Sequence, residues 1–354
     1  MTLAAWLHTL DPFVFRFSGE FGIRWYGLSY ALGFVVAYFL LRWMCRRGMT
    51  LIPEDRAGDV IIIGALGGVI GGRLGYVLFY QPSLLWQFSP SVPWWGVLDL
   101  MHGGMASHGG FVGAMLAAWR VSRGFKDGNG QVQGRAPVLH VMDTMALLTP
   151  TGLFLGRIAN FINGELLGKI VALPGGPSPW WTVKFPQELL GDQAPALSPD
   201  QQAQLQALIH DAAPAGGPDA LRTLLQRIEH GAPDLAQRIE PLISARWPSQ
   251  LLQAFAEGIV LGAAIWVIAR RPRLPGVITA WFLIVYGILR VVTEIWRLPD
   301  AQFAVGRPLG LSRGQWFSTA MVAVGLLLLW RIVSVGGQRL GGWSRCSADR
   351  GQHA

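Results

Sequence analysis

The chain has 354 residues, of which 51% are hydrophobic and only 14% are charged. Charged residues this sparse cannot cover the surface of a water-soluble protein of this length, so the composition excludes an ordinary soluble domain. The formal net charge of +8 does not indicate nucleic-acid binding, because the basic residues cluster at the ends of apolar runs. We therefore expect a protein of the lipid bilayer that binds no nucleic acid.

Seven apolar segments approach the roughly 20 residues that an α-helix needs to cross the hydrocarbon of a bilayer. In chain order they are residues 25–45, 60–80, 103–119, 138–159, 251–269, 276–296 and 315–332. The third segment is the least regular, because it is short. The sequence thus predicts an all-α, polytopic membrane helix bundle of about seven transmembrane helices.

Basic clusters follow the first, third, fifth and seventh of these segments, at residues 42–47, 120–135, 270–273 and 331–350. The positive-inside rule then places the N-terminus in the periplasm and the C-terminus in the cytoplasm. Three arginines in the outer loop before the last span run against this rule, and we expect them to contact lipid phosphate: Arg297, Arg307 and Arg313.

The pattern divides the chain into four predicted regions. Residues 1–159 hold spans one to four and an N-terminal periplasmic arm, 160–250 form a periplasmic head or insertion, 251–335 hold spans five to seven, and 336–354 are a cytoplasmic tail. Within the head, 199–211 and 218–230 have helical spacing between Pro and Gly breakers. Cys45 and Cys346 both fall on the cytoplasmic side, so we expect no disulfide.

Ionisable side chains recur in the outer halves of the spans, where a charge is costly unless it faces a cavity or a partner. Arg73, Arg157 and Arg290 belong to this layer, and the planar fork of arginine suits phosphate. We therefore expect an anionic phospholipid head group to bind there. The alternative is that Glu257 and Glu294 neutralise the arginines in structural salt bridges, and the spacing of Arg290 and Glu294 fits that role equally well.

His108 is the group in this layer best suited to exchange a proton near neutral pH, and His102 competes with it for that role. A lone interfacial histidine is more often part of the packing, but the glycines beside His108 favour a functional role. No zinc-hydrolase, serine-hydrolase or P-loop signature occurs, and we expect no metal and no cofactor. The glycines that indicate close helix packing are Gly64, Gly67, Gly68, Gly71 and Gly72.

Several long motifs resemble the prolipoprotein diacylglyceryl transferase family. The strongest is GRIANFINGELLGK at 156–169; the others are RWYGLSY at 24–30, GGRLGYVLFY at 71–80, SHGGFVGA at 107–114, PSQLLQAFAEG at 248–258, YGILRVVTEIWRLPD at 286–300 and LGLSRGQWFS at 309–318. The resemblance implies a multi-pass enzyme of the bacterial inner membrane, with its active site towards the periplasm. The implied reaction transfers diacylglyceryl from phosphatidylglycerol to the lipobox cysteine thiol of a preprolipoprotein, forming a thioether and releasing glycerol phosphate.

Roles for ten residues follow from the motifs and from the layer of charges. His108 resembles the family's base for the acceptor thiol, and Arg157 and Arg290 its phosphate-binding arginines. The predicted catalytic residues are His108, Arg157, Arg290 and Tyr26, and the predicted substrate-binding residues are Arg73, Asn160, Asn163, Glu165, Tyr286 and Glu294. A non-catalytic phospholipid transporter that uses the same arginines is the alternative, although the inner halves of the spans carry almost no polar lining.

The sequence also departs from the family pattern. Trp247 and Leu252 flank the PSQL stretch, where the family commonly has His and Tyr, so polar help from those two positions is in doubt. Ala159 stands where Gly is common in the signature, which is a small change. The segment from about 190 to 245 is longer than the family leads us to expect.

Overall fold

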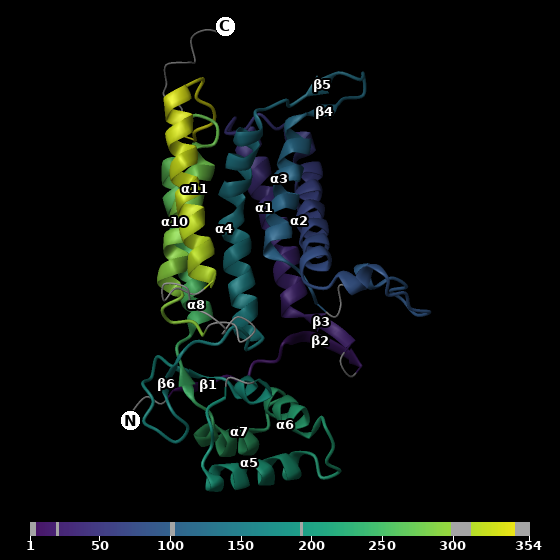
Figure 1. The fold of residues 1–354 in the computed structure, drawn as a ribbon, viewed down its shortest axis with the longest axis vertical. Coiled ribbons are helices and arrows are strands. Elements are labelled where there is room, and N and C mark those ends of the chain that lie inside the picture. The colour runs from purple at the N-terminus through teal and green to yellow at the C-terminus, as the bar shows by residue number, and fades with distance from the viewer. Residues whose placement is uncertain (1–4, 19–20, 100–102, 192–193, 299–312, 344–354) are drawn as a thin grey trace. The chain divides into compact units, whose positions relative to one another are not determined.

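The structure is a computed structural model that describes residues 5–18, 21–99, 103–191, 194–298 and 313–343 (Figure 1). The chain forms two compact units. Unit 1 comprises Met1–Gly33, Pro150–Gly262 and Ile284–Ala323, and unit 2 comprises Phe34–Thr149, Ala263–Leu283 and Val324–Ala354.

Helices occupy all seven predicted segments. They are α1 (Trp25–Arg46), α2 (Ala57–Phe79), α3 (Ser107–Ser122), α4 (Val138–Ile162), the continuous run of α8 (Ser249–Gln253), η6 (Ala254–Val260) and α9 (Leu261–Ile268), α10 (Val277–Thr293) and α11 (Arg313–Val335). Among the described residues, five runs are long and apolar enough to cross a membrane, and α10, with 17 residues, is a shorter apolar helix. At 1.5 Å per residue, the 16 residues of α3 span only about 24 Å. The protein is therefore a mostly helical membrane protein.

The all-α prediction is incomplete, because short strands accompany the helices. In unit 1, β1 (Trp6–Leu7), β7 (Val183–Lys184), β8 (Ala245–Arg246) and β6 (Ile170–Ala172) form one sheet in that order, and β2 (Phe13–Ser18) pairs antiparallel with β3 (Phe21–Arg24). In unit 2, β4 (Phe125–Lys126) and β5 (Val132–Gln133) form a hairpin. Most of these strands have only two or three residues, too few to show an alternation of apolar and polar side chains in the sequence. The remaining short turns are η1 (Glu54–Arg56), η2 (Pro82–Leu85), η3 (Gly96–Leu98), η4 (Pro186–Leu190) and η5 (Glu240–Leu242).

The insertion within unit 1 folds around a hydrophobic core of its own. It contains α5 (Pro199–Ala212), α6 (Ala220–Glu229) and α7 (Pro233–Ile239), which lie together in Figure 1. The two helices predicted there are confirmed, and the seven-residue α7 is an addition. Ser198 and Gln201 close a capping box at the start of α5. The buried core residues include Leu208, Leu224, Ile228 and Ile239.

Glycines let α2 and α3 pack against each other in unit 2, where Figure 1 shows the two helices side by side. A Cβ atom on Gly67 would lie 2.6 Å from the carbonyl oxygen of Gly113, and one on Gly75 would lie 2.7 Å from the Cα of Gly109. The packing role predicted for Gly67 is confirmed. Gly68 has no atom near its added Cβ, and Gly109, beside His108, packs against α2 instead of facing a ligand.

Two further features position the helices. In unit 1, η6 is a π-helical segment, and a Cβ on Gly258 within it would lie 2.6 Å from the Cβ of Phe154 on α4. In unit 2, the buried Asp143 carboxylate accepts hydrogen bonds of 2.7 Å from the backbone N–H groups of Gly276 and Thr279, and another from the Thr279 hydroxyl. Asp143 thereby caps the start of α10, which explains a charge that the sequence placed deep in a span.

Candidate active site

Unit 1 holds a buried network of arginines and glutamates. Both Nε and Nη2 of Arg157 lie 3.0 Å from Glu257 Oε2, and Arg290 Nη1 lies 3.8 Å from the other oxygen of Glu257. Arg290 Nη2 lies 3.3 Å from Glu294 Oε2, which is also 3.9 Å from Arg297 Nη1. The structure therefore brings Arg157, Arg290 and Glu294 together, as the sequence predicted.

Among the described residues, this network holds three arginines and two glutamates, and their side chains are at most 16% exposed. Charges this deeply buried are costly unless they are paired. The pairing of Arg157 and Arg290 with Glu257, and of Arg290 with Glu294, is the salt-bridge arrangement that the sequence offered as the alternative. Phosphate binding by the same arginines stays a prediction.

Glu257 is the member that the predicted site set lacks. It is fully buried, and it lies between Arg157 and Arg290 with one oxygen towards each. Its signal in the sequence was a carboxylate inside an apolar span, and the predicted alternative, in which Glu257 pairs with the arginines, is confirmed. The π-helical turn that carries Glu257 is a feature often found at functional sites.

Arg297 also joins the network, although the sequence placed it in an outer loop. It is only 6% exposed and pairs with Glu294, so it lies in the buried network, and its contact with lipid phosphate stays a prediction. Arg307 lies outside the described residues, and Arg313 begins α11.

The signature motif ends in a tight turn that gathers three predicted binding residues. Asn160 Nδ2 donates to one oxygen of Glu165 at 3.2 Å, and Asn163 Nδ2 donates to the other at 3.3 Å. Gly164 and Leu166 adopt positive φ angles of 64° and 55° to form the turn. The sequence prediction that these polar groups act together is thus consistent with their geometry.

Side chains from α8 and β8 hold this turn in place. Ser249 Oγ donates to the carbonyl oxygen of Leu166 at 3.0 Å, and Gln250 Nε2 donates to that of Glu165. Arg246, which is fully buried and paired with Glu188, donates to the carbonyl oxygen of Gly168 at 3.1 Å. Ser249 and Gln250 of the PSQL stretch therefore hold the signature motif by hydrogen bonds to its backbone carbonyl groups.

Three aromatic residues were singled out in the sequence: Tyr26, Tyr286 and Trp247. The hydroxyl groups of Tyr26 and Tyr30 are 3.5 Å apart, and their rings meet edge to face. Tyr286 lies one turn before Arg290 on the same face of α10. Trp247 packs against Trp181, with ring centroids 4.3 Å apart, so this position supplies an apolar surface where a histidine would supply a polar one.

Arg73 is committed to the backbone of unit 2. Its guanidinium donates four hydrogen bonds of 2.7–2.9 Å to the carbonyl oxygens of Gly96, Val97, Gly103 and Gly104. A buried arginine with four such acceptors fixes the segment that precedes α3. This arrangement favours a structural role over the predicted contact with substrate, and the latter stays a prediction.

His108 lies in the first turn of α3, and its side chain is exposed. An exposed imidazole at a helix start is accessible to a reactant, so the geometry leaves the predicted role as a base open. The competing candidate His102 lies outside the described residues. Among the described residues, no group of three or more His, Cys, Asp or Glu side chains is arranged to hold a metal ion.

Apolar spans, a buried arginine–glutamate network and a polar signature turn together define a polytopic membrane protein. The model of the prolipoprotein diacylglyceryl transferase family matches residues 12–331. A phosphatidylglycerol–prolipoprotein diacylglyceryl transferase of Bdellovibrio bacteriovorus is 39% identical, over 96% of this chain and 97% of the relative. Enzymes of the same name from Neisseria gonorrhoeae and Chromobacterium violaceum are each 36% identical, over 90% and 88% of this chain and 95% and 92% of the relatives. The chain belongs to the prolipoprotein diacylglyceryl transferase family.

Proposed function

We propose that the protein transfers the diacylglyceryl group of phosphatidylglycerol to the lipobox cysteine thiol of a preprolipoprotein. A carbon–sulfur bond forms between the thiolate and the glyceryl carbon that carried the phosphate. The carbon–oxygen bond to the phosphate breaks, and its electron pair leaves with glycerol phosphate. The thiol proton goes to a base, and no oxidant or reductant is required. The acceptor cysteine belongs to the substrate, so the enzyme needs no nucleophile of its own.

The observation that carries this proposal is that Arg157 and Arg290 meet at one buried carboxylate, that of Glu257. Arg157 and Arg290 approach Glu257 from two sides, which holds their remaining N–H groups in fixed positions. A departing phosphate ester gains negative charge, and donors already in place stabilise that charge without reorganisation. Arginine forks suit the geometry of phosphate oxygens better than a single ammonium group.

The other predicted residues take supporting roles in this proposal. His108 accepts the thiol proton, since a thiolate is the competent nucleophile. Tyr26, Tyr286 and the turn formed by Asn160, Asn163 and Glu165 position the donor lipid. We place the reaction in the bacterial inner membrane, towards its periplasmic side, in accord with the positive-inside rule.

The decisive experiment incubates the purified protein with phosphatidylglycerol and a lipobox peptide and then measures the peptide mass. We expect the mass to increase by one diacylglyceryl group, and a peptide with serine in place of cysteine to remain unmodified. His108→Ala and Arg157→Ala should abolish thioether formation while the protein still inserts and accumulates. Arg290→Lys should lower the rate by about 100-fold, because a point charge cannot replace a fork near two carboxylates.

Normal transfer by the purified His108→Ala and Arg157→Ala variants would contradict the proposed mechanism. Unaltered turnover by Arg290→Lys would contradict phosphate recognition at that residue. A matched control is Arg238→Lys, since Arg238 pairs with Asp211 on the surface of the insertion, away from the buried network. We expect that variant to transfer at the rate of the unmodified protein.

A further inference from the structure

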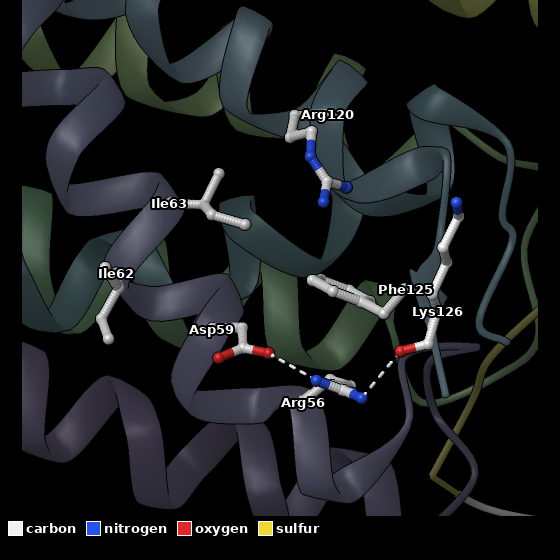
Figure 2. Close-up of a pocket in the computed structure, with 7 residues that line it drawn as sticks. All are labelled: Arg56, Asp59, Ile62, Ile63, Arg120, Phe125 and Lys126. Carbon is white, nitrogen blue, oxygen red and sulfur yellow. Dashed lines mark hydrogen bonds and ion pairs between the residues drawn. The ribbon is translucent and has the colours of Figure 1, made fainter. Parts of the chain in front are cut away.

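A cavity lies in unit 2, where α2 begins and α3 ends. It has a volume of about 330 Å³ and is lined by Arg56, Asp59, Ile62, Ile63, Arg120, Phe125 and Lys126 (Figure 2). None of these residues belongs to the ion network or to the signature turn. The cavity therefore requires an explanation of its own.

Cations and apolar side chains line different parts of this cavity. Figure 2 shows the ring of Phe125 between the guanidinium groups of Arg120 and Arg56, which lie 5.5 and 5.8 Å from its centroid. Ile62 and Ile63 lie on α2 at the other side of the cavity, and Ile62 is 58% exposed. The lining combines a charged end with an apolar wall, as the head group and acyl chain of a lipid require.

The side chains that line the cavity carry a net positive charge, and not all of it is neutralised by ion pairs among the described residues. Three cations and Asp59 leave two net positive charges. Arg56 is largely committed, since it contacts Asp59 at 3.2 Å, Asp55 at 3.4 Å and the carbonyl oxygen of Lys126 at 3.0 Å. Arg120 donates one bond of 3.1 Å to the carbonyl oxygen of Gly124, and neither Arg120 nor Lys126 forms an ion pair within the described parts of the chain.

The neighbouring carboxylate of Asp127 does not neutralise Arg120 or Lys126. Asp127 follows Lys126, but its oxygens accept hydrogen bonds from the backbone of Asn129 and Gln131 and from the Gln133 side chain, all within the hairpin. These hydrogen bonds, led by that from Gln131, lower the pKa of Asp127, so it stays ionised and bound to the turn. Arg120 and Lys126 thus keep donors available for an external anion.

We propose that this cavity binds an anionic glycerophospholipid that is not the reaction's donor. Its phosphate lies between Arg120 and Lys126, and one acyl chain runs along Ile62 and Ile63. The start of an apolar membrane helix is the depth at which lipid phosphates occur, and basic side chains there attract anionic lipids. The lipid joins the β4–β5 hairpin to α2 and stabilises the α2–α3 pair from this end.

The test uses the full-length protein in phosphatidylcholine nanodiscs doped with a phosphatidic acid that carries a diazirine in one acyl chain. After irradiation, mass spectrometry maps the label on the peptide that contains Ile62 and Ile63. Diazirine-bearing phosphatidylcholine gives the background from bulk lipid. We expect phosphatidic acid to label this peptide well above that background in the unmodified protein.

Arg120→Gln and Arg123→Gln form a matched pair of variants. Both arginines lie at the end of α3 and contact an aromatic ring, but Arg123 stacks on Trp119 and does not line the cavity. Arg120→Gln should lower the excess label about fivefold, as should Lys126→Gln, whereas Arg123→Gln should leave it unchanged. Arg56 donates to the backbone carbonyl oxygen of Lys126, and Lys126→Gln keeps that hydrogen bond. This variant therefore reports on the site even if Arg120→Gln folds poorly.

Two outcomes would overturn the proposal. Equal losses for Arg120→Gln and Arg123→Gln would mean that the whole basic surface attracts lipid without a defined site. Complete competition by millimolar inorganic phosphate would assign the cavity to a free anion, because phosphate lacks the chain that contacts Ile62. Persistence of the label in the presence of phosphate supports a lipid ligand.

Discussion

At the scale of single residues, Glu257 determines whether two buried arginines can coexist. Two guanidinium groups approach its carboxylate, so removal of the negative charge leaves them facing each other at a largely buried position. Loss of one partner from a buried ion pair is far more harmful than loss of one from a surface pair.

Glu257→Gln should therefore lower the free energy of unfolding by about 3 kcal/mol and reduce transfer activity. The comparison is Asp211→Asn, which breaks a pair whose side chains are about half exposed and should cost less than about 1 kcal/mol. Thermal unfolding in detergent measures both. Similar values for the two variants would show that the buried network is not held by Glu257.

His8 is another buried residue with an expected effect on stability. It is fully buried, its Nε2 lies 2.8 Å from the carbonyl oxygen of Phe161, and its ring packs 5.0 Å from that of Phe185. Burial lowers the pKa of His8 from 6.5 to about 4, although the hydrogen bond to Phe161 acts in the opposite direction. The folded protein therefore keeps this imidazole neutral.

The unfolded chain binds a proton at His8 below about pH 6.5, whereas the folded protein binds it only below about pH 4. Stability should thus fall as the pH decreases through this window, by about 3 kcal/mol at its lower end, and be fully retained above it. Unfolding midpoints recorded from pH 7 to pH 4 test this. His8→Gln should have a shallower dependence, and parallel curves would contradict the assignment.

At the scale of elements, the pairing of α2 and α3 depends on the absence of side chains at a few positions. Gly75→Ala should lower stability by about 1–3 kcal/mol, because its Cβ would meet the Cα of Gly109 and the backbones must separate. Gly68→Ala on the same helix has open space around it and should be neutral or stabilising by up to about 1 kcal/mol. Thermal unfolding of the two variants gives the comparison, and equal losses would exclude the packing explanation.

The elements themselves were predictable in proportion to their length. The apolar spans and the helices at 199–211 and 218–230 follow from periodicity, and they are present. The strands were not predictable, because β1, β7 and β8 have two residues each and are defined by distant partners. The π-helical turn of η6 also was not predicted, and it includes Gly258, which packs closely against Phe154 of α4.

At the scale of the whole molecule, the sequence predicted which residues are costly to bury and only some of the groups that neutralise them. Arg157, Arg290 and Glu294 lie in one network as expected, whereas Arg73 forms its bonds with carbonyl oxygens that any residue type provides. The buried pair of Arg246 and Glu188 was also missed, because 58 residues separate its partners. Partner choice of this kind depends on tertiary structure, which spacing does not encode.

The proposed orientation in the membrane gives a prediction for the whole chain. In a variant without Cys45 and Cys346, a cysteine introduced at Asn129 in the β4–β5 hairpin should react with a membrane-impermeant maleimide only after the cells are opened. A cysteine at Gln204, exposed on α5, should react in cells whose outer membrane alone is permeable. Labelling of both positions under the same condition would contradict a membrane crossing by α4, which separates them.

The π-helical segment has a consequence for the helix that follows it. A wider turn inserts one residue, and one residue corresponds to about 100° of rotation around an α-helix. Leu261 and Ile265 are fully buried in the register that this insertion creates. Conversion of the run to a regular α-helix with every residue kept would turn Leu261 and Ile265 out of their packed positions by about 100°. Deletion of Ile259 removes the extra residue together with the wide turn, so it should keep both side chains packed and narrow the turn that carries Glu257. The one extra residue that widens the turn at Glu257 thus also determines which face of the eight-residue α9 meets lipid.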